Sequence, residues 1–213
     1  MSATVGDRER DKRLRQYWDK QADTYDRRTT WAERRLFAGT RPWLCRRATG
    51  DTLEVAIGTG LNLEHYPIGL SLTGIEWSPA MLAVARARAH RLHREVTLRD
   101  GDARDLPFRA AQFDTVVSTF ALCSIPDADQ ALAEMARVLR PGGLLLLADH
   151  VESSVLPVRV LQRLVDVVTV PTQGERYCHR PLRAVLAMGF ALEAHERLHL
   201  GVVERIAARR PAI

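Results

Sequence analysis

The stretch Glu54-Val55-Ala56-Ile57-Gly58-Thr59-Gly60-Leu61-Asn62 decides the fold of this chain. Residues 52–57 form a short run that is mostly apolar and rich in β-branched side chains, which predicts a buried strand. Gly58 and Gly60 then allow a sharp turn and a close approach of backbone to ligand, where a Cβ atom would collide. Residues 61–66 are predicted to be helical, so N–H groups at the start of that helix would point toward the turn. In a parallel sheet, such a turn is a cradle for a nucleoside-bearing cofactor.

The composition is that of a soluble globular protein. The chain has 213 residues, of which 46% are hydrophobic and 27% charged, enough for one domain with a sizeable core. No apolar run approaches the length of a membrane span, and no N-terminal stretch resembles a signal peptide. The cysteines, Cys45, Cys123 and Cys178, form no C-x-x-C pair and are odd in number, which argues against a disulfide framework and favours a cytoplasmic location.

The charge pattern argues against a nucleic-acid partner. The net charge is +5, but the arginines are spread along the chain and mixed with acidic residues. A nucleic-acid-binding protein would gather them in a basic stripe or carry a recognisable RNA-binding signature, and neither is present.

Strands and helices alternate from residue 52 onward. The expected strands are 52–57, 70–76, 95–99, 113–119 and 144–148, and an antiparallel pair, 190–197 and 202–208, closes the sheet. The expected helices are 61–66, 78–93, 127–139, 154–169 and 181–188. This alternation predicts an α/β fold with a doubly wound, Rossmann-like, mostly parallel seven-stranded sheet and an antiparallel C-terminal strand. We expect a single domain, 1–213, with its core in 48–213.

Residues 1–47 are expected to form an N-terminal helical lid. Residues 1–12 are polar and are predicted to be a loose terminus. Residues 13–27 have helical spacing, and 31–47 form a second amphipathic stretch, bent at Pro42. That second stretch sets Trp31 and Trp43 among several arginines. It fits a helix packed over the sheet, but also a surface that contacts a membrane or a lipid-like substrate, so peripheral membrane contact is a possible partner interaction.

Polar residues follow successive strands where each one ends. Glu76 ends the strand 70–76, where an acid can accept hydrogen bonds from ribose hydroxyls. Asp102 follows the strand 95–99 and could accept a hydrogen bond from an adenine amino group. Residues 118–122, at the end of the strand 113–119, would lie beneath the reactive end of a cofactor. The third glycine of the dinucleotide fingerprint is replaced by Leu63, which counts against NAD and FAD.

Taken together, these motifs resemble the class I S-adenosylmethionine-dependent methyltransferases. Within that family the chain is similar to the ubiquinone/menaquinone-type and the phospholipid- and thiol-methylating branches. The resemblance covers about residues 13–208. Ala56 departs from it, because many members carry glycine there, and Glu76 replaces the commoner aspartate. The matching runs are EVAIGTGLN (54–62), GIEWSPAML (74–82), GDARDLPF (101–108), FDTVVSTFALCSIPD (113–127) and VLRPGGLLLLADH (138–150).

The resemblance implies S-adenosylmethionine as the cofactor and assigns roles along the chain. The run YWDKQADTYD (17–26) resembles the family's lid motif, which suggests that Tyr25 lies near the methyl donor. Nine cofactor-binding residues are implied. Ala56, Gly58 and Gly60 would face the methionine part, and Glu54 lies just before them. Glu76 would bind the ribose, Trp77 would pack on the adenine, Asp102 and Ala103 would form hydrogen bonds to the adenine, and Phe120 would border the sulfonium.

The acceptor side is less defined. The methyl donor is already reactive, so the protein mainly aligns donor and acceptor, and a base is needed only if the acceptor must lose a proton. Candidates are Asp149 and His150, after the strand 144–148, and Tyr177 and His179, in the loop before the helix 181–188. His150 and His179, with Tyr25, form the expected catalytic set. The pairs His90/His93 and His195/His199 lack a converging third ligand, so no metal site is expected.

Three functions remain open at this point. The leading one is methylation of a small amphipathic molecule at nitrogen, sulfur, oxygen or activated carbon. The others are an NAD(P)-dependent oxidoreductase and a non-catalytic protein that binds a cofactor or a membrane surface. The sequence predicts no oligomeric state.

Overall fold

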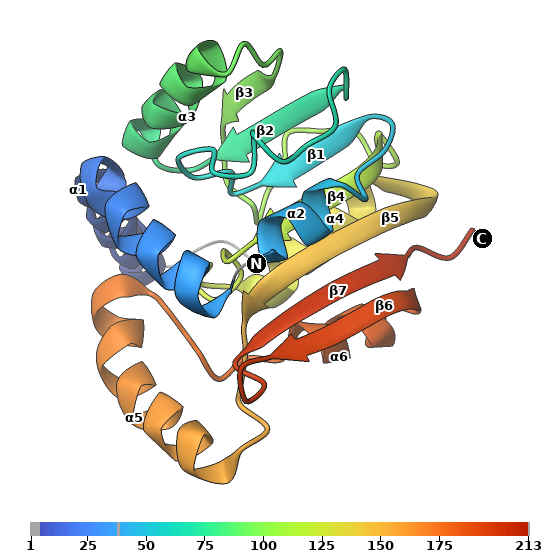
Figure 1. Cartoon of the computed structure of the whole chain (residues 1–213). Coiled ribbons are helices and arrows are strands. Elements are labelled where there is room, and N and C mark those ends of the chain that lie inside the picture. The colour runs from blue at the N-terminus through green and yellow to red at the C-terminus, as the bar shows by residue number, and fades with distance from the viewer. Residues whose placement is uncertain (1–4, 38, 213) are drawn as a thin grey trace.

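A seven-stranded sheet forms the centre of the molecule (Figure 1). The structure is a computed structural model that describes residues 5–37 and 39–212; the side chains of residues 5 and 30–36 are not described. The strand order of the sheet is β3-β2-β1-β4-β5-β7-β6. The strands are β1 (Thr52–Val55), β2 (Leu72–Glu76), β3 (Thr97–Asp100), β4 (Phe113–Thr119), β5 (Leu139–His150), β6 (Ala191–Leu198) and β7 (Val203–Arg209). Only β7 runs against its neighbours, so the predicted doubly wound sheet with one antiparallel C-terminal strand is confirmed.

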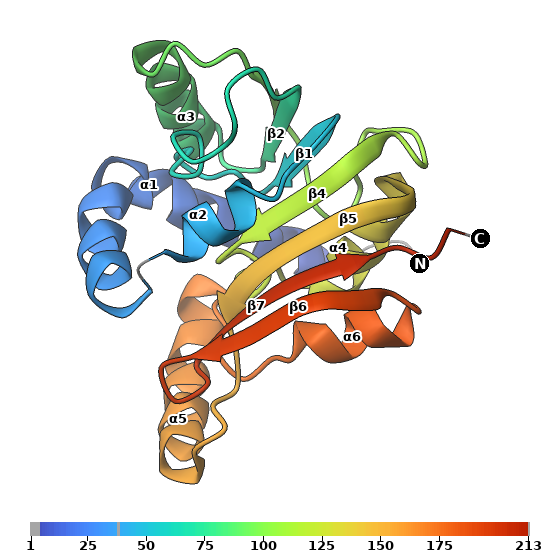
Figure 2. The same cartoon turned by 45° about the vertical axis from the view of Figure 1, so that its right-hand side comes forward.

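Helices cover both faces of the sheet, as Figures 1 and 2 show. They are α1 (Val5–Leu36), α2 (Thr40–Cys45), α3 (Pro79–Arg91), α4 (Ala128–Val138), α5 (Leu156–Gln173) and α6 (Pro181–Ala187). Ser78 caps α3 by accepting a hydrogen bond from the Met81 N–H, and Asp127 caps α4 in the same way. Among the described residues, none of these helices combines the length and the apolarity that crossing a bilayer requires.

The core is divided by the sheet into two layers. Side chains alternate along a strand, so Val116 of β4 packs into the layer beneath α4 and α6, while Val117 packs into the layer beneath α2 and α3. Leu145 and Leu146 of β5 divide in the same way. Because the central strands are buried on both faces, they read as continuous apolar runs rather than as alternating ones.

The N-terminal region differs from its prediction. α1 is one helix of 32 residues that starts at Val5, so residues 5–12 are helical rather than loose. The second helix, α2, is limited to Thr40–Cys45, because Gly39 adopts a φ of 82° that interrupts the helical path. Pro42 lies in the first turn of α2, where its missing N–H costs no hydrogen bond, and therefore does not bend the helix.

Only part of the surface predicted over residues 31–47 has described side chains. The side chains of Trp31, Arg34, Arg35 and Leu36 lie outside the described residues. Leu44 is fully buried, and the half-buried Trp43 donates its indole N–H to Glu196 at 2.9 Å. α2 therefore packs against the sheet, and the lid interpretation of residues 1–47 stays a prediction.

The segment after the glycine turn was predicted wrongly. Residues 61–66 form successive tight turns, with the Leu63 N–H bonded to the Gly60 carbonyl at 3.0 Å and the His65 N–H to the Asn62 carbonyl at 2.9 Å. Asn62 turns its amide inward to a buried polar network, and Pro67 follows too soon for a helix to develop. No helix N-terminus therefore stands behind the turn.

Other boundaries moved as well. β5 begins at Leu139 rather than 144, because Leu139 already pairs with Phe113 of β4; the regular pairing resumes at Leu144, after an irregularity that contains Gly142 with a φ of 72°. α5 continues to Gln173, four residues beyond the predicted end, and stops where Gly174 adopts a φ of 78°.

Candidate functional site

A pocket opens at the carboxyl ends of β1, β2 and β4, beneath α1, where the strand order reverses between β1 and β4. It encloses about 860 Å³, part of it open to solvent, which is in the range of small-molecule sites. Eight predicted cofactor-binding residues line it: Glu54, Ala56, Gly58, Glu76, Trp77, Asp102, Ala103 and Phe120. The sheet therefore gathers residues that lie far apart in the sequence.

Gly60, the ninth predicted residue, does not line this pocket. A Cβ atom there would lie 2.8 Å from the Leu63 Cδ1 and 3.4 Å from the Ala85 backbone, so this glycine allows the turn to pack on α3. Gly58 differs, because a Cβ atom would meet nothing closer than the Met81 sulfur at 4.0 Å. The space beside Gly58 opens toward the pocket, as a cradle for a ligand requires.

Acidic residues occupy one end of the pocket. The buried Glu76 accepts hydrogen bonds from the N–H groups of Gly58 and Ser78, both at 2.8 Å. Burial raises its pKa against the effect of these bonds. Each carboxylate oxygen keeps a lone pair, so Glu76 can still accept hydrogen bonds from two hydroxyl groups.

Asp102 is held by a neighbouring arginine. The Arg104 N–H binds one oxygen at 2.8 Å, and the Arg104 guanidinium binds the other at 2.7 Å. Although burial opposes it, these bonds lower the pKa of Asp102. The Arg104 guanidinium also lies 5.6 Å from the centre of the Trp77 ring, so it orders both residues predicted to contact an adenine.

A buried polar network occupies the other end. Glu54 accepts hydrogen bonds from the Asn62 amide at 2.8 Å and the Tyr66 hydroxyl at 2.9 Å. Burial raises the pKa of Glu54 to about 7, against the hydrogen bonds and the nearby Arg41. Arg41 donates to Asn62 at 2.9 Å and lines the pocket, with its guanidinium 5.5 Å from the Phe120 ring centre. Arg41 is not among the residues predicted for the site, because no sequence pattern distinguishes it from the other arginines nearby.

A second pocket lies between α1, β5 and the loop after α5. Its walls are mainly aromatic, and Trp18, Tyr25 and Phe120 line both pockets. Tyr25 therefore lies at the pocket that the predicted cofactor-binding residues line. The other residues that line the second pocket are Tyr17, Gln21, Arg28, Thr29, Phe37, Cys123, His150, Gln173, Glu175 and Tyr177.

His150 stands in the wall of the second pocket, as predicted for an acceptor-side residue. Its ring centre lies 5.0 Å from that of Phe120, 5.2 Å from that of Phe37 and 5.6 Å from that of Tyr177. These contacts fix the orientation of the imidazole at the boundary with the cofactor pocket.

His179 lies elsewhere. It lines a smaller hollow, with Arg10 and Arg176, and its Nε2 is 3.8 Å from the carboxylate of Asp149. Asp149 is buried and accepts hydrogen bonds from the N–H groups of Cys123 and His150. Burial works against it, but Asp149 raises the pKa of His179. The expectation that His179 borders the acceptor is not met: it contacts the acid behind that pocket.

Two ionisable residues give the second pocket its polarity. Glu175 accepts a hydrogen bond from the Tyr177 hydroxyl at 2.6 Å, and Arg28 is bound to Gln21 at 2.7 Å. Both act on Tyr17: besides burial, Glu175 raises the pKa of Tyr17 and Arg28 lowers it. Among the described residues, no three His, Cys, Asp or Glu side chains gather as metal ligands.

The fold defines a class of protein, the Rossmann-like α/β proteins, and solved methyltransferases share it. A solved structure from Thermotoga maritima, described as a possible histamine N-methyltransferase, matches 91% of this chain and 98% of its own, with a TM-score of 0.68 and 19% identity. A putative methyltransferase from Haloferax volcanii, solved with its activator Trm112, matches 91% of this chain and 97% of its own, with a TM-score of 0.65 and 20% identity. At such identities these likenesses show the fold alone.

Sequence comparison gives the family. Residues 53–147 match the family model described as a methyltransferase domain. The phosphatidylethanolamine N-methyltransferase of Cereibacter sphaeroides is 42% identical over 103 residues, 47% of this chain and 51% of its own. The demethylmenaquinone methyltransferase of Thermus thermophilus is 38% identical over 106 residues, 48% of each chain. Residues 53–147 therefore form a domain similar to the class I S-adenosylmethionine-dependent methyltransferases, and the matches span about half the length of these relatives.

Proposed function

We propose that this protein transfers a methyl group from S-adenosylmethionine to an amine nitrogen of a small amphipathic acceptor. The observation that carries the proposal is the meeting of two pockets at Trp18, Tyr25 and Phe120. One pocket fits the cofactor, and the other fits an acceptor that approaches the same point. S-adenosylmethionine supplies an electrophilic methyl group on a sulfonium when it is bound.

The first pocket has the donors and acceptors that this cofactor needs. At one end, Glu76 would accept hydrogen bonds from the ribose hydroxyls, and Trp77 would pack against the adenine. At the other end, Arg41 would pair with the carboxylate of the methionine part. The rings between the pockets would align the reacting atoms and exclude water.

The second pocket favours an amine. Aromatic faces attract cations, and a carboxylate among them adds charge complementarity, which Glu175 supplies. Arg28 of the same pocket would bind an anionic group such as a phosphate. The neutral imidazole of His150 would accept the proton that an ammonium group loses before its nitrogen attacks.

The relatives' names divide between two kinds of acceptor. The C. sphaeroides relative is named for phosphatidylethanolamine, and a structural neighbour from Haemonchus contortus for phosphoethanolamine, both N-methyltransferases. Other relatives are named for demethylmenaquinone, whose flat ring could also pack between aromatic side chains. Glu175 supports the amine over the quinone, because a carboxylate attracts a charged ammonium group more strongly than an uncharged ring.

The test is a labelled-methyl screen over ethanolamine phospholipids, soluble amines, thiols and quinols, with products identified by mass. We expect methylated amines, and a Glu175→Gln variant should lose activity chiefly through a higher acceptor KM. Methylation of quinols or thiols alone would reject the amine. Absence of S-adenosylmethionine binding in calorimetry would reject the entire proposal. The single domain of residues 1–213, with a lid at 1–47, and the cytoplasmic location stay predictions.

A further inference from the structure

α5 presents its apolar side chains to solvent. None of its 18 residues is buried. Its exposed residues recur with helical spacing and cover one side of the helix, and the large apolar ones are 39–72% exposed: Leu156, Val160, Leu161, Leu164, Val165, Val167 and Val168. Figures 1 and 2 show this helix extending away from the sheet. An amphipathic helix of a globular protein normally turns this side toward the core.

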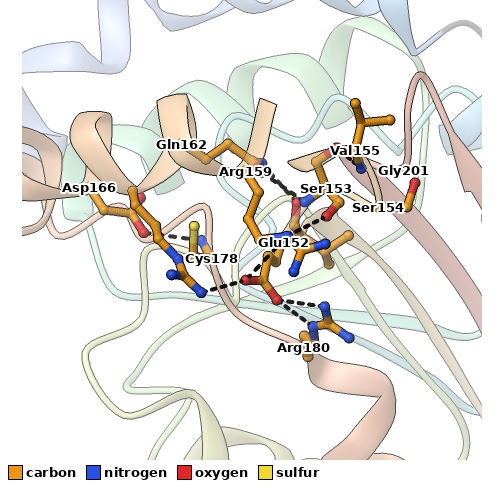
Figure 3. Close-up of polar contacts among 12 residues, drawn as sticks. Glu152, Ser153, Ser154, Val155, Arg159, Gln162, Asp166, Cys178, Arg180 and Gly201 are labelled. Carbon is orange, nitrogen blue, oxygen red and sulfur yellow. Dashed lines mark hydrogen bonds and ion pairs between the residues drawn. The ribbon is translucent and has the colours of Figure 1, made fainter. Parts of the chain in front are cut away.

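The polar side of α5 faces the protein instead, as Figure 3 shows. The Gln162 side chain donates to the Val151 carbonyl at 2.9 Å and accepts from the Ser153 N–H at 2.8 Å. Asp166 accepts from the N–H groups of Tyr177 at 2.7 Å and Cys178 at 3.1 Å. These bonds fix the rotation of the helix, so the outward direction of its apolar side is built into the fold.

The apolar surface continues past the start of the helix. Leu200, at the turn between β6 and β7, is 63% exposed. Its carbonyl accepts hydrogen bonds from the Ser153 hydroxyl at 2.6 Å and the Ser154 N–H at 3.2 Å, which places this turn beside the N-terminal end of α5. We call these eight side chains, seven on α5 and Leu200, the α5 face.

Positive charge is concentrated beside the α5 face. Glu152 forms ion pairs with three arginines there: Arg180 at 2.6 Å, Arg163 at 3.2 Å and Arg159 at 3.7 Å. With Asp166 of α5, two carboxylates face three arginines, so one positive charge remains in excess, and the side chain of Arg163 is 67% exposed. The net charge of the chain, +5, has the same sign.

We propose that the α5 face lies on the surface of an anionic lipid bilayer. An apolar helix side bordered by arginines suits the boundary between headgroups and acyl chains. A second copy of the chain fits less well, because a stable interface takes about 20–30 residues from each side and this face offers eight large apolar ones. The C-terminal end of α5 adds a reason: Gln173 and the following Glu175 line the second pocket, so an amphipathic molecule could pass from bilayer to pocket.

The experiment is co-sedimentation of the full chain with vesicles of phosphatidylcholine, with and without phosphatidylglycerol. We expect binding to the anionic vesicles that weakens as salt is raised. A Leu161→Gln/Leu164→Gln variant should lose about tenfold in vesicle affinity. The matched control is Ile68→Gln/Leu192→Gln, which replaces two exposed apolar residues elsewhere, 95% and 43% exposed, and should bind as the wild type does.

Three results would overturn the inference. The first is that the wild type does not bind anionic vesicles at low salt, and the second is that the control variant loses as much vesicle affinity as the α5 variant. The third is that the wild type is a dimer, which the α5 variant converts to a monomer while vesicle binding stays unchanged. Circular dichroism verifies that both variants fold, as expected for exposed positions. The inference does not rest on the proposed reaction. Calorimetric binding of S-adenosylmethionine should be equal in all three proteins, which separates a failure of the membrane surface from a failure of the cofactor site.

Discussion

Two residues of the cofactor pocket have backbone torsions that are unusual for side chains with a Cβ atom. Ala56 has a φ of 56° and Phe120 a φ of 54°. Left-handed conformations of this kind cost about 1–2 kcal/mol and are found preferentially at functional sites. Both residues directly follow strands of the sheet, β1 and β4, where the chain must turn across the pocket.

The first prediction concerns this strain. Ala56→Gly should raise the free energy of unfolding by about 0.5 kcal/mol, since relief of the left-handed strain exceeds the greater entropy of glycine in the unfolded chain. Gly58 has a φ of 58° and serves as the matched control, because Gly58→Ala should lower the same quantity. Urea unfolding measures both. A clear loss of stability in Ala56→Gly would show that the alanine methyl group matters more than the strain.

The second prediction concerns Glu54. Burial raises the pKa of Glu54 to about 7 from an ordinary 4.5, so the folded protein holds a proton that the unfolded chain has released. Between these pH values the free energy of unfolding should therefore fall as pH rises, by an amount on the order of 3 kcal/mol, and level off above pH 7.

Glu54→Gln removes this titration and should flatten that part of the stability profile. Urea unfolding at pH 5 and pH 8 for both proteins provides the measurement. The control is Glu64→Gln, which removes an exposed carboxylate from the turns that follow the pocket. An unchanged slope in Glu54→Gln would mean that Glu54 is ionised throughout this range.

At the scale of elements, α1 is held over the carboxyl edge of the sheet by acids along its length. Asp11 binds Arg104 at 2.6 Å, Asp19 binds the Ser78 hydroxyl at 2.5 Å, and Asp26 binds the Thr59 hydroxyl at 2.6 Å. Each partner follows a different strand, so the helix bridges the loops that form the cofactor pocket. This explains why a helix with few buried apolar residues remains in place.

The third prediction tests this attachment. Asp26 also pairs with Arg88, a buried side chain of α3. Asp26→Asn should weaken binding of S-adenosylmethionine about tenfold, because hydrogen bonds to charged groups contribute about 1.5–3 kcal/mol and their loss loosens the lid. Calorimetry provides the measurement. Asp23→Asn, at an exposed position of the same helix, should leave the affinity as it is, and an equal effect of both changes would exclude a specific attachment.

At the scale of the molecule, the two pockets predict that cofactor affinity and turnover can be separated. His150 lines only the acceptor side. His150→Ala should change the affinity for S-adenosylmethionine by less than about 0.5 kcal/mol, as changes outside that site do, while single-turnover methylation slows at least tenfold. A full rate in the variant would remove His150 from the reaction.

The sequence by itself determined the class of fold, because short apolar runs and glycine turns are local properties of the chain. It also located most of the cofactor pocket, since Glu76, Asp102 and Phe120 follow successive parallel strands, and the ends of such strands share one edge. Gly60 was misplaced because two glycines in one turn read alike, and only their neighbours in space show which one faces the ligand.

The tertiary structure alone decided what depends on contacts between distant segments. Arg41 enters the cofactor pocket because the buried amide of Asn62 holds it there, and His179 leaves the acceptor side because Asp149 attracts it. The periodicity of α5 predicts an amphipathic helix equally well in either rotation. Its rotation is fixed by backbone groups at Ser153 and Cys178 that bind its polar side, and their positions are a property of the folded chain.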